Sequence, residues 1–323
     1  MSALDPAIPY AYLLSGFVVL YFGAEWLVGA SARLAVRFGV KPLLVGVTIV
    51  AMGTSAPEFV VSVQAAAAIP TRGGIAVGNV VGSNICNTAL VLGLSALICP
   101  ILVSKQFFKF DIPVLIGVSF LAWHFLSDGA IQVWEGVVIL ALFAGYMAFN
   151  IANAKAGGGE DAGVAAGDEK KVSVVKNVLL VLLGLGMLIG GANLLVNGAV
   201  KIAESFKVSE AVIGLTIVAF GTSLPELATS VVAAVRKHND IAVGNVVGSN
   251  LFNILCILGV VGVMGNKDTG MDTGGVVPRD LMIMSLINVV LLMPLVAKRT
   301  LNRWIGGLLA GAYIAYIFML AFY

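Results

Sequence analysis

Ten apolar segments, each about as long as a membrane-spanning helix, run along this sequence. A helix needs about 20 mostly apolar residues to cross the hydrocarbon core of a bilayer. The composition points the same way, because 59% of the residues are hydrophobic and 11% are charged, whereas ordinary soluble domains are about 25% charged. We therefore expect an all-α integral membrane protein with ten transmembrane helices, at residues 11–36, 43–69, 74–99, 107–126, 130–152, 174–203, 211–235, 240–264, 279–297 and 300–322.

The ten segments form two groups of five that share a sequence pattern. Val45–Ser62 aligns with Ile213–Ser230 at 11 of 18 identical positions, and Ile75–Asn87 aligns with Ile241–Asn253 at 11 of 13. Because five is an odd number, the second group must enter the membrane with the opposite polarity. Inverted repeats of this kind are typical of secondary transporters, whose substrate and ion sites lie near the bilayer midplane on discontinuous helices.

The positive charges predict the orientation of the chain in the membrane. Cytoplasmic loops carry an excess of Lys and Arg. If the N-terminus is outside, 14 of the 19 Lys and Arg residues fall on the inside and 5 on the outside. We therefore predict that the N- and C-termini both lie outside. The chain then has three units: a first five-helix repeat at 1–152, a Gly/Ala-rich cytoplasmic linker at 153–173 and a second, inverted five-helix repeat at 174–323.

Two copies of a GTS-x-PE motif place polar groups inside apolar segments. On a helix, residues at i, i+3, i+4 and i+7 share one face. These residues are Ala51, Thr54, Ser55 and Glu58 in the first copy and Ala219, Thr222, Ser223 and Glu226 in the second. Pro57 and Pro225 cannot donate a backbone hydrogen bond, so each frees a carbonyl in the preceding turn. Carboxylate, hydroxyl and carbonyl oxygens are hard ligands that suit Ca²⁺ or Na⁺ rather than zinc or copper.

A second stripe of neutral oxygen donors follows each motif, within the repeated run IAVGNVVGSN and just beyond it. Its members are spaced four apart and share a helical face: Asn79, Ser83 and Asn87 in the first copy, and Asn245, Ser249 and Asn253 in the second. Gly78/Gly82 and Gly244/Gly248 are small-xxx-small pairs, which let helices approach closely. Close approach would bring this stripe onto the carboxylate motif. Asn79 and Asn245 are either packing residues or ligands.

The charge of the two glutamates indicates what the site carries. Glu58 and Glu226 should meet near the axis that relates the repeats. Two carboxylates close together in a low dielectric cannot both stay ionised without a cation. One Ca²⁺ or two Na⁺ would neutralise them, and a third Na⁺ would leave one positive charge to cross the membrane. Ca²⁺ and Na⁺ would then compete for one site, as the two substrates of an antiporter do.

The motifs GTSAPE and GTSLPE, each followed by GNVVGSN, resemble the alpha repeats of the calcium/cation antiporter superfamily, in its sodium/calcium exchanger branch of prokaryotic type. The resemblance covers essentially the whole chain and implies a secondary active antiporter that exchanges Na⁺ for Ca²⁺ by alternating access. It also implies the metal ligands, which would be Glu58, Glu226, Thr54, Ser55, Thr222, Ser223, Ala51, Ala219, Ser83, Asn87, Ser249 and Asn253. Potassium-dependent members carry aspartate in place of Asn253, so we expect no need for potassium.

Other functions remain as alternatives. A proton/calcium antiporter of the same superfamily is the closest rival, and a channel would use similar oxygen ligands. An enzyme would need a histidine base near Ser55 or Ser223, and neither serine has one near it in the sequence. We expect no cofactor, since Ca²⁺ and Na⁺ are transported substrates. The expected surroundings are a lipid bilayer, in a prokaryotic plasma or inner membrane. No nucleic-acid-binding pattern and no protein partner is evident.

Several other polar residues in the apolar segments have simpler interpretations. Glu25 either lines an ion path or contacts interfacial water. Asp111, Asp128 and Glu135 are expected at the membrane interface. The three cysteines, Cys86, Cys99 and Cys256, lack a metal-like spacing and are read as packing residues.

Overall fold

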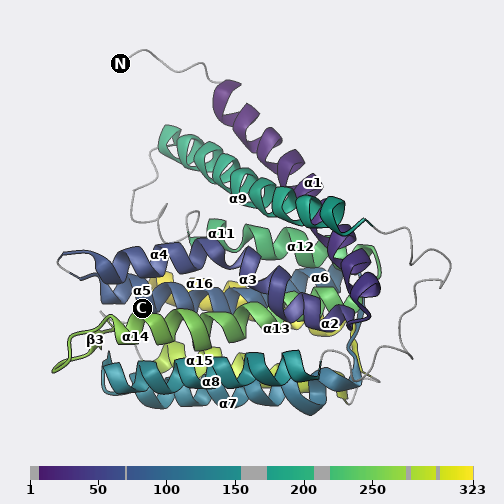
Figure 1. Ribbon diagram of the computed structural model, residues 1–323. Coiled ribbons are helices and arrows are strands. Elements are labelled where there is room, and N and C mark those ends of the chain that lie inside the picture. Colours follow the sequence, from purple (N-terminus) through teal and green to yellow (C-terminus); the bar gives the residue numbers. More distant parts are fainter. Residues whose placement is uncertain are drawn as a thin grey trace.

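The computed structural model describes residues 7–69, 71–153, 173–206, 219–273, 278–295 and 299–322. Within these ranges the regular secondary structure is helical apart from four two-residue strands (Figure 1). The predicted all-α class is therefore confirmed.

The helices of the first repeat follow the expected segments, and two of these segments are broken into several pieces. They are α1 (Ala7–Phe38), α2 (Pro42–Val45), α3 (Ala51–Thr54), α4 (Ala56–Ala67), α5 (Gly73–Ile85), α6 (Leu92–Ile98), α7 (Ile112–Leu126) and α8 (Val133–Ala152). Three π-helical turns connect or extend them: Gly46–Val50, Cys86–Val91 and Phe107–Asp111. Such turns are rare and are often found at functional sites.

Among the described residues, the second repeat has the same succession of helices, and a counterpart of α2 would lie outside them. Its helices are α9 (Val174–Ser205), α11 (Ala219–Thr222), α12 (Leu224–Val235), α13 (Asn239–Phe252), α14 (Gly259–Val263), α15 (Pro278–Val289) and α16 (Arg303–Phe322). A π-helical turn at Asn253–Leu258 joins α13 to α14, in the place that Cys86–Val91 has between α5 and α6. A 3-10 helix at Val290–Leu295 continues α15.

Seven helices in the described ranges are long and apolar enough to cross a membrane, and an eighth span forms if the bent pair Pro42–Thr54 and Ala56–Ala67 is counted as one. These spans coincide with eight of the ten expected segments. The seventh segment is described only from residue 219 onward. The ninth consists of the 12-residue α15 and the 3-10 helix that follows it. The protein is thus a multi-pass membrane protein, and the count of ten spans stays a prediction.

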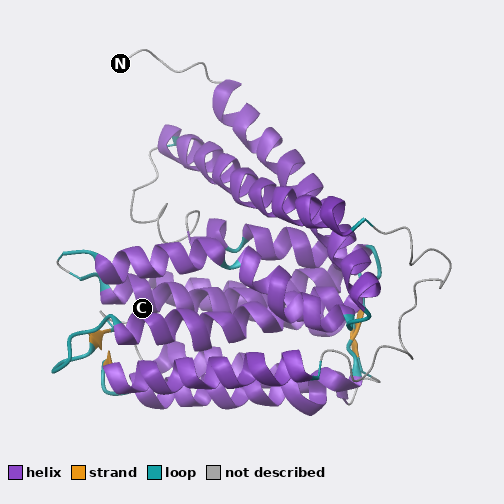
Figure 2. Ribbon diagram, in the orientation of Figure 1, coloured by secondary structure: helices purple, strands orange, loops and turns teal. Residues whose placement is uncertain are grey.

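Two small antiparallel sheets show how the repeats are related. β1 (Ile101–Leu102) pairs with β4 (Thr300–Leu301), and β2 (Ala130–Ile131) pairs with β3 (Met271–Asp272). β1 and β3 occupy equivalent connections of the two repeats, and so do β2 and β4. Each sheet therefore joins two non-equivalent connections, one from each repeat, and the two sheets lie at opposite ends of the helices (Figure 2). This is the arrangement expected of two copies with opposite polarity.

The helices that carry the GNVVGSN run lie at the centre of the molecule. Of the membrane spans, Asn239–Val263 and Gly73–Ile98 are the most enclosed, with 83% and 72% of their residues buried inside the protein. α1 and α9 lie side by side and slant across the other helices (Figure 1). Their contact is close because glycine lines it: a Cβ built on Gly16 would lie 2.9 Å from the carbonyl oxygen of Gly191.

Candidate cation-binding site

Each GTS-x-PE motif interrupts its helix at the serine, so the motif does not lie on the single continuous helix that was assumed from the sequence. Ser55 (φ −84°, ψ 9°) separates α3 from α4, and Ser223 (φ −87°, ψ 5°) separates α11 from α12. Each proline therefore lies in the first turn of a new helix, where its missing N–H is not needed. In the first repeat the helix axis bends by 48° at this break. Glu58 and Glu226 lie in the first turn after the break.

The breaks bring the two motifs together across the repeats. The hydroxyl of Ser55 donates a hydrogen bond of 2.8 Å to Oε1 of Glu226. Thr54 and Ser249 also interact with this carboxylate. Glu58 interacts electrostatically with Glu226, and with Thr222 and Ser223 of the opposite motif. Each glutamate therefore faces hydroxyl groups of the other repeat, so the two motifs form one site.

Many polar atoms of this site are buried without a hydrogen-bond partner among the described residues. They are both carboxylate oxygens of Glu58, Oε2 of Glu226, Oγ of Ser223 and both polar side-chain atoms of Asn87 and of Asn253. All five residues are fully buried. An unpaired buried polar group costs about 1–3 kcal/mol, and more if it is charged. Oxygen atoms with no partner, gathered around two carboxylates, fit a bound metal cation that would supply the missing interactions.

The second stripe of oxygen donors lies against the first motif, as expected from its glycines. A Cβ built on Gly248 would lie 2.5 Å from Cα of Val47, so only glycine allows α13 to approach this closely. As a result the hydroxyl of Ser249 lies 3.5 Å from that of Thr54 and 3.4 Å from the carbonyl oxygen of Ala51. Asn87 and Asn253 lie in the π-helical turns of the two repeats. Ser83 is buried on α5, and Ala219 begins α11.

The sequence profile of the sodium/calcium exchanger protein family matches residues 8–152 and 176–322, which are the two repeats. The chain belongs to the sodium/calcium exchanger family. As a member of this family it is a membrane antiporter of Ca²⁺ and other cations and not an enzyme.

Several similar proteins align with nearly the whole of this chain. This exchanger-family protein is 37% identical over 315 residues to the putative antiporter CaxA of Alkalimonas amylolytica, which covers 96% of this chain and 97% of that relative. It is 30% identical over 350 residues to the sodium/calcium exchanger MaX1 of Methanosarcina acetivorans, covering 97% and 98%. Its fold matches the solved sodium-calcium exchanger NCX_Mj, soaked with 10 mM Na⁺ and zero Ca²⁺, at a TM-score of 0.82 and 35% identity over 96% of this chain and 98% of that one.

Within this exchanger-family protein, Glu25 has a charged partner that was not expected from the sequence. Its carboxylate forms an ion pair with Arg236, at the end of α12, with Nε of Arg236 3.0 Å from Oε2 of Glu25. The side chains of Glu25 and Arg236 are 28% and 54% exposed on the surface of the protein. The ion pair joins α1 to the end of α12, and the role of Glu25 in an ion path or in contact with interfacial water stays a prediction.

Two of the three acidic residues expected at the membrane interface are buried within the protein. Asp111 is fully buried and accepts a hydrogen bond of 2.9 Å from the hydroxyl of Tyr146. Glu135 is 6% exposed and accepts a hydrogen bond of 2.8 Å from the backbone of Gln132, which caps α8. One carboxylate oxygen of each residue has a partner, whereas Oδ2 of Asp111 is buried without one among the described residues. Asp128 is exposed as expected.

Two groups of residues near the site were not recognised from the sequence. Cys86, read as a packing residue, is buried and interacts with Ser223 and both glutamates. A buried polar chain runs beside the site: Asn250 donates to Thr88 (2.7 Å), Thr88 donates to Asn288 (2.7 Å), and Asn288 donates to Ser119 (2.9 Å). Asn84 and Asn250 occupy the same position in the two copies of the run IAVGNVVGSN. This repetition could have indicated the start of the chain of hydrogen bonds.

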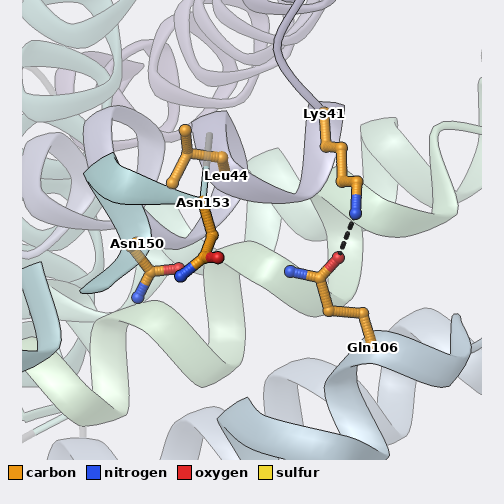
Figure 3. A pocket seen from close by; sticks show the side chains of 5 residues that line it. All are labelled: Lys41, Leu44, Gln106, Asn150 and Asn153. Carbon is orange, nitrogen blue, oxygen red and sulfur yellow. Dashed lines mark hydrogen bonds between the residues drawn. The ribbon is translucent and has the colours of Figure 1, made fainter. Parts of the chain in front are cut away.

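A small polar pocket lies at the ends of several helices. Its lining is Lys41, Leu44, Gln106, Asn150 and Asn153, and Nζ of Lys41 donates a hydrogen bond of 2.8 Å to Oε1 of Gln106 (Figure 3). None of these residues belongs to the two motifs. The lining holds a lysine and no carboxylate, so this pocket does not suit a cation.

Proposed function

We propose that this protein exchanges Na⁺ for Ca²⁺ across a membrane by alternating access, at one site near the bilayer midplane between its two GTS-x-PE motifs. The observation that supports this most is the contact between the repeats. Ser55 of one repeat binds Glu226 of the other at 2.8 Å, and the nearby carboxylate of Glu58 has both oxygens unpaired within the described residues.

The proposed ligands are oxygen atoms from both repeats. Alanine can offer only its backbone carbonyl, serine and threonine offer hydroxyl or carbonyl oxygens, and asparagine offers its amide oxygen. The two glutamates supply the charge. The set is Ala51, Thr54, Ser55, Glu58, Ser83 and Asn87 in the first repeat and Ala219, Thr222, Ser223, Glu226, Ser249 and Asn253 in the second.

Charge balance explains how one site can couple two ions. The two buried carboxylates favour one Ca²⁺ or two Na⁺, because either choice leaves the site neutral. Both cations prefer the same hard oxygen ligands, so the binding of one excludes the other. The protein would then cross between outward-open and inward-open states only with a loaded, neutralised site, and this requirement couples the two fluxes.

Protons are the rival coupling ion, since protonation would also neutralise Glu58 and Glu226. The hydroxyl and amide oxygens around the glutamates favour Na⁺, because a proton needs one acceptor whereas Na⁺ needs several oxygen ligands. Calcium uptake into proteoliposomes distinguishes the two. We expect uptake driven by an outward Na⁺ gradient at equal pH, and little uptake driven by a pH gradient without Na⁺. The reverse result would establish proton/calcium exchange.

We further propose that both termini lie outside the cell and that the protein resides in a prokaryotic plasma or inner membrane. α1 begins and α16 ends at the same end of the molecule, whereas α8 ends and α9 begins at the other (Figure 1). This supports an even number of crossings, and the excess of Lys and Arg selects the orientation. Labelling of single cysteines at residues 3 and 160 with a membrane-impermeant reagent tests it: residue 3 should react in intact cells, and residue 160 only after lysis.

A further inference from the structure

Asn245 makes three hydrogen bonds that join the two halves of the site, although it is not among the proposed ligands. It is fully buried on α13, one turn before Ser249. Its Nδ2 donates to the backbone carbonyl of Glu226 (3.2 Å) and to the hydroxyl of Ser230 (3.0 Å). Its Oδ1 accepts a hydrogen bond of 3.0 Å from the hydroxyl of Thr54, in the other repeat.

These contacts determine the positions of Nδ2 and Oδ1 in the side-chain amide of Asn245. A side-chain amide has two N–H donors on one atom and an acceptor on the other. The carbonyl of Glu226 can only accept, so Nδ2 must face it, and Oδ1 must then face Thr54. Asn79 repeats the donor half of this pattern in the first repeat, because its Nδ2 donates to the carbonyl of Glu58 (3.0 Å) and to the hydroxyl of Ser62 (2.9 Å).

The hydroxyl of Thr54 has one proton, and its two nearest acceptors are Oδ1 of Asn245 at 3.0 Å and the carbonyl oxygen of Ala51 at 3.2 Å. The hydroxyl of Ser249, at 3.5 Å, and the carboxylate of Glu226 are further acceptors near it. A hydroxyl oxygen binds a cation through its lone pairs, so its proton must point away from the cation. If the proton goes to Ala51, that carbonyl is occupied as well. If it goes to Asn245, the oxygens of both Thr54 and Ala51 remain free.

We propose that Asn245 is a positioning residue of the cation site, which holds the proton of Thr54 away so that Thr54 and Ala51 can both bind the ion. The inference rests on the proposed cation site. Asn245 itself does not touch the ion. It acts as an outer-shell partner, and removal of such a partner lowers metal affinity by about 10- to 100-fold in other metal sites.

The test is the equilibrium binding of Ca²⁺ to purified protein in Na⁺-free detergent solution. Asn245→Leu keeps the side-chain size and removes the amide, and we expect the Kd for Ca²⁺ to rise by about 10- to 100-fold. Asn250→Leu is the matched control. Asn250 is equally buried on the same helix and donates to Thr88 at 2.7 Å, which is not a proposed ligand. We expect its Kd to stay within about twofold of wild type.

Two variants of Thr54 separate positioning from a general structural role. In a Thr54→Val background there is no hydroxyl to orient, so Asn245→Leu should change the Kd little further. In a Thr54→Ser background the hydroxyl remains, and Asn245→Leu should again raise the Kd by about 10-fold or more. An equal loss in the Val and Ser backgrounds, or no loss in wild type, would overturn the inference. Asn245→Ala provides the same comparison if Asn245→Leu does not fold.

The same measurement distinguishes this inference from the proposed function. If the wild-type protein bound no Ca²⁺, the proposed function would fail. If the wild-type protein bound Ca²⁺ and Asn245→Leu bound it equally well, only the role of Asn245 would fail.

Discussion

At the scale of single residues, the site depends on two carboxylates that lack a charge partner. Glu58 and Glu226 are fully buried, and three of their four carboxylate oxygens have no hydrogen-bond partner in the part of the chain described. Ionised carboxylates in hydrocarbon are unfavourable by at least a few kcal/mol. A bound cation removes this penalty, and in its absence a proton is the alternative.

Calcium binding should therefore weaken as the pH falls. Protons compete with Ca²⁺ for Glu58 and Glu226, because the empty site cannot keep both carboxylates ionised. We expect the Kd for Ca²⁺, measured in Na⁺-free buffer, to rise steadily from about pH 8 to about pH 5, and binding of Ca²⁺ to release protons. A Kd independent of pH over this range, with no proton release in weakly buffered solution, would contradict the two-carboxylate account.

Potassium should not be needed, and Asn253 is the residue on which this expectation depends. Asn253 is fully buried with both polar side-chain atoms unpaired within the described residues, and as an amide it adds no charge to the site. Asn253→Asp could add a third negative charge and room for one more monovalent cation. We expect wild-type calcium flux to persist when lithium or choline replaces potassium, and the flux of Asn253→Asp to depend on potassium.

Each half of this prediction can fail separately. Loss of wild-type flux on removal of potassium would refute the expectation for the native protein. Potassium-independent flux in Asn253→Asp would refute only the switch, and would indicate that the new carboxyl group stays protonated.

At the scale of helices, two features bring the residues of the proposed site together: the interruption of two helices at a serine, and the close approach of α13 to the first motif. The serine breaks place each glutamate at a helix start, and glycine lets α13 lie directly against the turn that precedes α3. Gly248 is the tightest of the glycines in this contact, since a Cβ there would lie 2.5 Å from Cα of Val47. The contact also sets the distances from Ser249 and Asn245 to Thr54.

Gly248→Ala should push α13 away from the first motif. The clash is with backbone atoms, so the helices must separate, and overpacking of this kind typically costs about 1–3 kcal/mol. We expect a lower thermal unfolding midpoint in detergent and weaker Ca²⁺ binding. Gly145→Ala is the control, because a Cβ at Gly145 on α8 would meet nothing within 4 Å. Equal behaviour of the two variants would contradict the role of this contact.

Sequence patterns predicted the helices better than the contacts between them. Apolar segment length located eight of the ten predicted spans, and the prolines marked the two motifs where the helices are interrupted, because both are local properties of the chain. The pairing of Glu25 with Arg236 and of Asp111 with Tyr146 depends on how distant helices pack. The bridge from Asn245 to Thr54 depends on the same packing, so the sequence left Asn245 as either a packing residue or a ligand and could not show what it binds.

At the scale of the whole molecule, the proposed alternating access depends on the relation between the two repeats. Equivalent elements of the two halves, such as β1 and β3, occur at opposite ends of the protein, and the glutamates meet between them. Such symmetry gives two related conformations, each open to one side. The net charge carried in each conformation then determines whether the membrane potential contributes to transport.

Transport should be electrogenic, with more than two Na⁺ exchanged for each Ca²⁺. Two carboxylates are neutralised by one Ca²⁺ or two Na⁺, and a third Na⁺ carries one net charge. Each net charge gains about 2.3 kcal/mol per 100 mV. We expect Na⁺-driven calcium flux in proteoliposomes to change when valinomycin and potassium gradients set the potential. Flux that is indifferent to the potential would indicate a two-for-one exchange.

The central claim is that one site, shared by the two repeats, carries both ions, and sodium-driven ⁴⁵Ca²⁺ uptake by glutamate variants tests it most directly. Glu58→Gln and Glu226→Gln keep the side-chain shape and remove the charge. Each is to be purified, checked for an unchanged elution profile and reconstituted beside the wild-type protein. The account predicts calcium uptake in the wild-type protein and its loss in both variants, because neither carboxylate alone can balance the charge of Ca²⁺. Near-normal uptake in either variant would contradict it.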